Sequence, residues 1–145
     1  MSLSYTAEKQ VAIAAVRRAC MLTASVFNKL VKNETLTKDD KTPVTVGDYS
    51  AQAVINTILN RAFPSDPIVG EEDSADLRPE SATTLRNRIV ELANETLTAP
   101  IQSGEEASWG LGPEHAQTPE QIMDVIDKGN YGGSSTGRKP PQNHR

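Results

Sequence analysis

Length, composition and charge limit the classes of protein to which this sequence can belong. The 145 residues fit one domain, and apolar residues make up 37%, below the usual ~45–50% of globular chains. A net charge of −4 disfavours a nucleic-acid-binding surface, and without a run of about 18 apolar residues we expect no membrane span. The first residues lack signal-peptide features, so we expect a cytoplasmic protein, with the nucleus as a second compartment.

The first predicted element is a long amphipathic helix. Apolar residues recur along it at spacings of three and four, which places them on one face: Val11, Ala15, Ala19, Leu22, Val26 and Leu30. Lys9, Arg17 and Arg18 fall off this stripe, and we expect them to be solvated. Cys20 is the only cysteine, so it forms no internal disulfide, and its apolar helical position predicts a buried, inert thiol.

Two short strands around a polar turn are predicted next, at residues 36–38 and 43–46. Asp48 follows them and opens a second helix, whose apolar residues at 51–62 share one face. A proline-containing turn ends this helix, and the apolar pair at 68–69 predicts another short strand.

The rest of the chain predicts two further helices and a long loop between them. The weaker helix spans about 79–97, and the loop at 98–116 is rich in glycine and proline. Thr118 begins a strong helix-start pattern, with proline at the first helical position and glutamine three residues after the cap. Gly129 is a natural terminator for that helix, and residues 132–145 are predicted to be a flexible tail.

Asp48 and Glu71 are the candidate site residues. Each has a simpler interpretation, because Asp48 suits a helix N-cap and Glu71 suits a solvated loop acid. Carboxylates at strand ends and helix starts are also common magnesium ligands, since this cation prefers oxygen donors. Two carboxylates are too few for a catalytic site, so residue types alone leave both interpretations open. His115 and His144 have no matching ligand role.

A longer motif surrounds the two carboxylates. Residues 38–52 read Lys-Asp-Asp-Lys-Thr-Pro-Val-Thr-Val-Gly-Asp-Tyr-Ser-Ala-Gln, and Phe63-Pro64 and Val69-Gly70-Glu71-Glu72 follow. This combination resembles the inositol monophosphatase superfamily, whose members are magnesium-dependent, lithium-sensitive phosphatases. The resemblance covers about residues 5–138. Two further segments, Gly129-Asn130-Tyr131 and Gly137-Arg138, favour the branch that hydrolyses adenosine 3',5'-bisphosphate.

The resemblance implies a fold, a cofactor and a substrate. The fold would be a layered α/β fold, with residues 1–131 as its N-terminal part. Mg²⁺ would be the cofactor: Glu71 matches the ligand of the main magnesium ions, and Asp48 matches the residue that orients or deprotonates the attacking water and touches a weaker magnesium. Lys38 falls in a flexible metal-associated loop of the family, although a surface lysine is the simpler interpretation.

The implied substrate is adenosine 3',5'-bisphosphate, which loses its 3'-phosphate to give AMP. The related 3'-phosphoadenosine phosphosulfate would also be hydrolysed, which links the family to sulfur assimilation and salt tolerance. An inositol-phosphate phosphatase of the same superfamily is one alternative. A noncatalytic interaction module is the other.

The sequence departs from the family pattern after Arg138. Members of the family continue into a strand carrying Asp-Pro-Ile-Asp-Gly-Thr, which supplies two more metal-binding aspartates and a threonine that helps to activate water. Residues 139–145 read Lys-Pro-Pro-Gln-Asn-His-Arg instead. We therefore expect a truncated form with weak magnesium affinity, no turnover by itself, and self-association through an exposed sheet edge.

Overall fold

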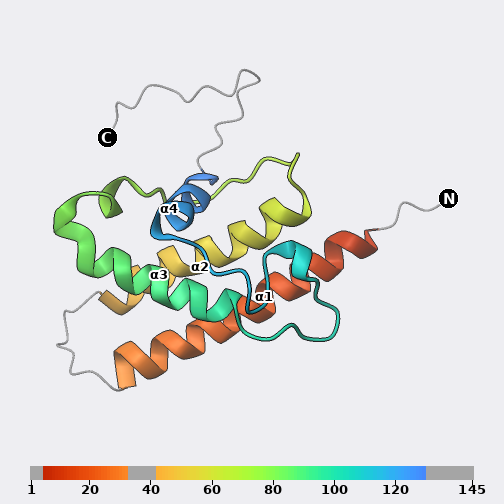
Figure 1. Cartoon of the computed structure of the whole chain (residues 1–145), viewed down its shortest axis with the longest axis horizontal. Helices are drawn as coiled ribbons and strands as arrows, with labels where there is room; N and C mark the ends of the chain where they lie inside the picture. The colour runs from red at the N-terminus through yellow and green to blue at the C-terminus, as the bar shows by residue number, and fades with distance from the viewer. Residues whose placement is uncertain (1–4, 33–41, 130–145) are drawn as a thin grey trace.

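The computed structural model describes residues 5–32 and 42–129, and the helices of this part pack around one another (Figure 1). Within these residues the α-helices are α1 at Thr6–Val26, α2 at Thr42–Ala62, α3 at Thr83–Leu97 and α4 at Pro119–Asp127. A π-helical turn at Phe27–Lys32 extends α1, and 3₁₀ turns lie at Ala75–Leu77, Glu80–Ala82 and Ala107–Trp109. The predicted tail and Lys38 lie outside the described residues.

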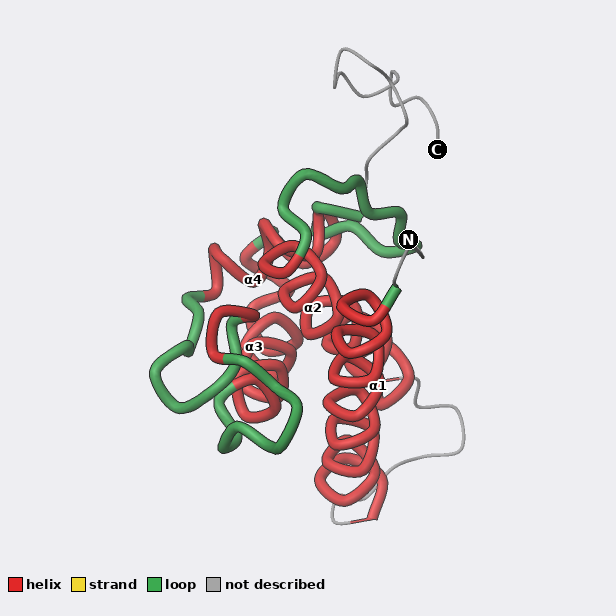
Figure 2. The backbone as a smooth tube through the Cα atoms, turned by 90° about the vertical axis from the view of Figure 1, so that its right-hand side faces the viewer, coloured by secondary structure: helices red, strands yellow, loops and turns green. Residues whose placement is uncertain are grey.

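Helix α2 lies at the centre of the packing. It contacts α1, α3 and α4, and α1 and α3 also contact each other. In Figure 2, α3 appears to the left of α2 and α1 to its right. Its inward positions are fully buried because they recur at helical spacing: Val46, Ala53, Val54 and Ile58. Burial of one such apolar side chain contributes roughly 1.5–3 kcal/mol. The central helix therefore provides a rigid base for side chains on its remaining, outer face.

The predicted strand at 43–46 is wrong, because these residues form the first turn of α2. Pro43 suits this place, since a helix leaves its first N–H groups unpaired and the fixed φ of proline matches the helix. Val46 is buried in the core, which outweighs the β-propensity of valine. The partner strand at 36–38 lies outside the described residues, and of the predicted strand at 68–69 only an isolated bridge at Val69 is present. The layered α/β fold stays a prediction.

Arg18 was predicted to be solvated but is fully buried. Its guanidinium donates hydrogen bonds to the carbonyls of Thr96 (2.9 Å), Ala99 (3.0 Å) and Pro100 (3.0 Å). It also pairs with the Glu105 carboxylate through two donors, one of them Nε at 3.1 Å from Oε2. Arg18 thus attaches the predicted loop at 98–116 to α1.

The outer face of α1 is more apolar than expected. Cys20 is exposed there, contrary to the prediction of a buried thiol, and Ile13, Val16 and Phe27 are exposed as well. The predicted stripe does face the core, and Arg18 lies on it as well, whereas Cys20 is exposed because it lies off this stripe. The buried members of the predicted stripe are Val11, Ala15, Leu22, Val26 and Leu30. Thr6–Leu30 is long and apolar enough to span a membrane. Core helices of soluble proteins and N-terminal signal sequences also have this length and composition.

The two later helices confirm the predictions made for them. Helix α3 ends at Leu97, as expected, and a 3₁₀ turn precedes it where the prediction placed the first helical residues. Helix α4 begins with a complete capping box, in which the Thr118 hydroxyl accepts from the Gln121 N–H and the Gln121 side chain accepts from the Thr118 N–H. Local hydrogen bonds therefore define this helix start.

Candidate functional site

Asp48 and Glu71 line the same hollow, which has a volume of about 360 Å³ and lies between α2 and residues 69–72. Both carboxylates are exposed. Asp48 is not an N-cap, because α2 begins six residues before it at Thr42. It instead projects from the outer face of a helix whose inner face is held in the core. The structure thus brings together two residues that the sequence singled out, while their roles as metal ligands stay predictions.

The hollow carries a concentration of negative charge. Partial burial raises the pKa of Glu72, and the neighbouring charges of Asp48, Glu71 and Asp73 raise it further. Burial likewise raises the pKa of Tyr49, with added contributions from nearby acidic residues, first among them Glu72. A group of carboxylates that disfavour one another's charged forms attracts cations, because a bound cation relieves the repulsion.

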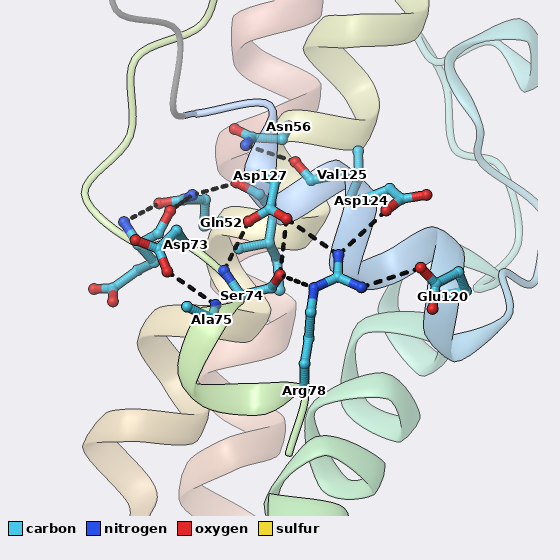
Figure 3. A network of polar contacts seen from close by, with 12 residues as sticks. Gln52, Asn56, Asp73, Ser74, Ala75, Arg78, Glu120, Asp124, Val125 and Asp127 are labelled. Carbon is cyan, nitrogen blue, oxygen red and sulfur yellow. Dashed lines mark hydrogen bonds and ion pairs between the residues drawn. The ribbon is translucent and has the colours of Figure 1, made fainter. Parts of the chain in front are cut away.

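Side-chain amides on α2 hold the walls of the hollow. The Gln52 amide bonds to the backbone of Glu72, with Nε2 donating to its carbonyl at 2.8 Å and Oε1 accepting from its N–H at 3.1 Å. One turn later, the Asn56 Nδ2 donates to the carbonyl of Val125 at 3.0 Å. Figure 3 shows Gln52 and Asn56 side by side, facing α4. Gln52 belongs to the sequence motif, and its position four residues after Asp48 on α2 is the signal that indicates a shared helix face.

A second set of polar contacts holds the chain immediately after the acidic residues (Figure 3). Asp127 on α4 accepts hydrogen bonds from the Ser74 N–H at 2.7 Å and from the Ser74 hydroxyl at 2.8 Å. Arg78 donates to Ser74 Oγ at 2.7 Å and forms ion pairs with three acidic residues of α4: Glu120, Asp124 and Asp127. The segment 71–73 is therefore held at two points. Gln52 holds the backbone of Glu72, and Asp127 holds Ser74, the residue that follows the segment.

The donor chemistry of the hollow fits a hard divalent cation. Asp48 and Glu71 offer carboxylate oxygens, which suit Mg²⁺, and the cation would keep several waters in such a site. Within residues 5–32 and 42–129, however, no group of three or more histidine, cysteine, aspartate or glutamate residues is arranged to hold a metal. His115 does not line the hollow. The described residues therefore hold two candidate ligands at one hollow, without a third metal-binding side chain grouped with them.

Comparisons with known proteins show which phosphatases this chain resembles. No protein-family model matches the chain. It is 48% identical over 140 residues to a 3'(2'),5'-bisphosphate nucleotidase of Schizosaccharomyces pombe, a match that covers 94% of this chain and 37% of the relative. It is 40% identical to 3'(2'),5'-bisphosphate nucleotidase 1 of Candida albicans, over 92% of this chain and 35% of that protein.

A plant protein gives the same result. The probable 3'(2'),5'-bisphosphate nucleotidase 3 of Arabidopsis thaliana is 33% identical over 94% of this chain and 36% of its own length. The chain is thus a homologue of 3'(2'),5'-bisphosphate nucleotidases, which confirms the predicted resemblance. It spans little more than a third of the length of these relatives.

Proposed function

We propose that this chain carries part of the Mg²⁺ site of a phosphatase that acts on adenosine 3',5'-bisphosphate and on 3'-phosphoadenosine phosphosulfate. One observation carries the proposal: Asp48 and Glu71 line one hollow in a chain that matches bisphosphate nucleotidases over 94% of its length. The relatives named above are nucleotidases, which favours a nucleotide over an inositol phosphate as the substrate.

The roles proposed for the two carboxylates are those that the family resemblance implies. Asp48, on α2, would orient or deprotonate the attacking water and touch a weaker magnesium. Glu71, on the loop that Gln52 holds beside α2, would bind the main magnesium ions. Bound Mg²⁺ lowers the pKa of a coordinated water and neutralises phosphate charge.

The same proposal includes weak cation binding and no turnover by this chain alone. Two-metal phosphatase sites clamp both the attacking and the leaving oxygen. The described residues offer no group of three metal-binding side chains for that purpose. The layered α/β architecture also belongs to the proposal, with α1 to α4 as helices of that fold.

Manganese binding tests the proposed cation site directly. Mn²⁺ is a paramagnetic substitute for Mg²⁺, and its free concentration in a titration of the purified chain is measured by electron paramagnetic resonance. We expect weak binding by the wild type and a loss of binding in Asp48→Asn and in Glu71→Gln. Glu114→Gln is the matched control, because Glu114 is an exposed acid that does not line the hollow. Equal binding by all four proteins would contradict the proposed site.

Phosphate release tests the proposed lack of turnover. The purified chain is incubated with adenosine 3',5'-bisphosphate and Mg²⁺, and Glu71→Ala serves as the background control. We expect the same rate from both proteins. A wild-type rate above that of Glu71→Ala would show that the chain is active by itself and would refute this part of the proposal.

A further inference from the structure

The Gln52 side chain uses its whole amide to join three segments. Nε2 donates to the Glu72 carbonyl at 2.8 Å and to the Ile126 carbonyl at 2.9 Å, and Oε1 accepts from the Glu72 N–H at 3.1 Å. Both amide hydrogens and one oxygen acceptor position are therefore satisfied by backbone groups. One side chain of α2 holds the acidic loop and the end of α4 at the same time.

Two glycines leave the space that this amide needs. A Cβ atom on Gly70 would lie 2.7 Å from Gln52 Oε1, and one on Gly129 would lie 2.9 Å from Gln52 Nε2. The two glycines also contact each other, since the Gly70 N–H donates to the Gly129 carbonyl at 2.9 Å. Any larger residue at either position would displace the amide. The backbone at Gly70 and Gly129 therefore packs directly against the Gln52 amide.

The position of Gln52 links the two candidate ligands. Asp48 lies four residues before Gln52 on α2, so the two side chains share one helix face. Glu71 directly precedes Glu72, whose peptide groups the amide holds. The amide therefore fixes the backbone that carries Glu71 relative to the helix that carries Asp48.

Like charges make such a restraint necessary. Asp48 on α2 lines the same hollow as Glu71 and Glu72, and the like charges of these carboxylates favour movement of the loop away from the helix. Hydrogen bonds from a neutral amide oppose that movement without adding a positive charge that would compete with a cation.

We propose that Gln52 is a positioning residue for the cation site, which sets the placement of Glu71 relative to Asp48. The proposal rests on the proposed function, because it requires a cation between these carboxylates. Removal of a group that orients a metal ligand typically lowers metal affinity about 10- to 100-fold. We expect a loss of this size when the Gln52 amide is removed.

The chain contains a matched control for this experiment. Asn94 on α3 holds the backbone of Gln117 in the same way, with Nδ2 donating to its carbonyl and Oδ1 accepting from its N–H, each at 2.8 Å. Asn94 does not line the hollow. Gln52→Met and Asn94→Leu thus each replace a two-sided amide contact by an apolar side chain of similar size, one near the carboxylates and one away from them.

Each variant of the full chain is measured for urea stability and for Mn²⁺ affinity by electron paramagnetic resonance. We expect both variants to lose stability, but only Gln52→Met to bind Mn²⁺ about 10- to 100-fold more weakly. Wild-type affinity in folded Gln52→Met overturns the inference, and so does an equal loss of affinity in Asn94→Leu. If Gln52→Met does not fold, Gln52→Asn replaces it, with the same expectation, because its amide is one methylene too short.

The Glu71→Gln variant separates the two levels of the argument. If it loses Mn²⁺ binding while Gln52→Met keeps it, the proposed site stands and the role of Gln52 is refuted. If the wild type does not bind Mn²⁺, or if Glu71→Gln binds it as well as the wild type, both the proposed site and the role of Gln52 are refuted.

Discussion

Replacement of Arg18 by methionine is expected to destabilise the protein strongly. Methionine fills a similar volume but leaves the Glu105 carboxylate and the carbonyls of Thr96, Ala99 and Pro100 without their donor. The side chains of both Arg18 and Glu105 have no exposed surface. Removal of one partner from a buried ion pair typically costs about 3–5 kcal/mol, because the other charge stays buried and unpaired. Native domains are stable by only about 5–15 kcal/mol.

Urea unfolding followed by circular dichroism measures this loss. With a typical m-value of about 2 kcal/mol/M, the midpoint of Arg18→Met is expected to fall by about 2 M. Arg17→Met is the control, because Arg17 is partly exposed and its nearest contact with Glu105 is 3.8 Å long. Exposed pairs of this kind contribute about 0–1 kcal/mol. A loss below about 1 kcal/mol in Arg18→Met, or equal losses in both variants, would refute the reasoning.

The same ion pair predicts a dependence of stability on pH. Burial acts to raise the pKa of Glu105, but hydrogen bonds from Arg18 and the Gln102 N–H, together with the charges of Arg18 and Arg17, lower it below its ordinary 4.5. A lowered pKa in the folded state means that the stabilisation is complete above the unfolded value and is lost as pH falls through the folded value. The melting temperature of the wild type should therefore fall below about pH 4.5, and Arg18→Met should show a smaller fall.

Three further predictions concern single residues. Gly47→Ala should raise the urea-unfolding free energy by roughly 0.5–1 kcal/mol, because Gly47 lies inside α2 with nothing within 4 Å of an added Cβ; an unchanged or lower value would contradict this. Gly70→Ala should lower that free energy, because its Cβ would meet Gln52 Oε1 at 2.7 Å; wild-type stability would show that the amide can move aside. Thr118→Ala should lower it by about 1 kcal/mol through loss of the cap on α4, and Thr118→Ser is the control that keeps the hydroxyl.

Local patterns in the sequence were sufficient to predict most of the helices. The apolar spacing from Val11 to Leu30 predicted α1, and the pattern at Thr118 predicted the start and the cap of α4. These features depend on residues within a few positions of one another, so they can be recognised in a single sequence. The strand prediction at 43–46 was wrong because local propensity and tertiary packing disagree there. Its valines favour strands locally, whereas burial of Val46 in the core and a proline in the first turn favour the helix.

The sequence predicted the two carboxylates of the candidate site but not the hydrogen bonds that hold the surrounding backbone. The motif containing Asp48 and Glu71 is recognisable in the sequence, and the structure places both residues at one hollow. The hydrogen bonds from Gln52 to Glu72 and Ile126 could not be predicted from local patterns, because the partners lie 20 and 74 positions away in the chain. No local pattern distinguishes a glutamine that holds a loop from one that is solvated.

The sequence by itself determined where most of the helices lie, how α4 is capped, and which carboxylates belong to a family motif, because each of these depends on neighbouring residues. The apolar stripe of α1 was also predicted, and its members Val11, Leu22 and Val26 are buried. The tertiary structure decided which polar side chain joins that stripe in the core. Arg18 enters the core because Glu105, 87 residues later, supplies its charge partner, and Cys20 is exposed because that buried stripe lies elsewhere on α1. Burial of a charge requires partners from distant segments, and only the folded chain brings those together.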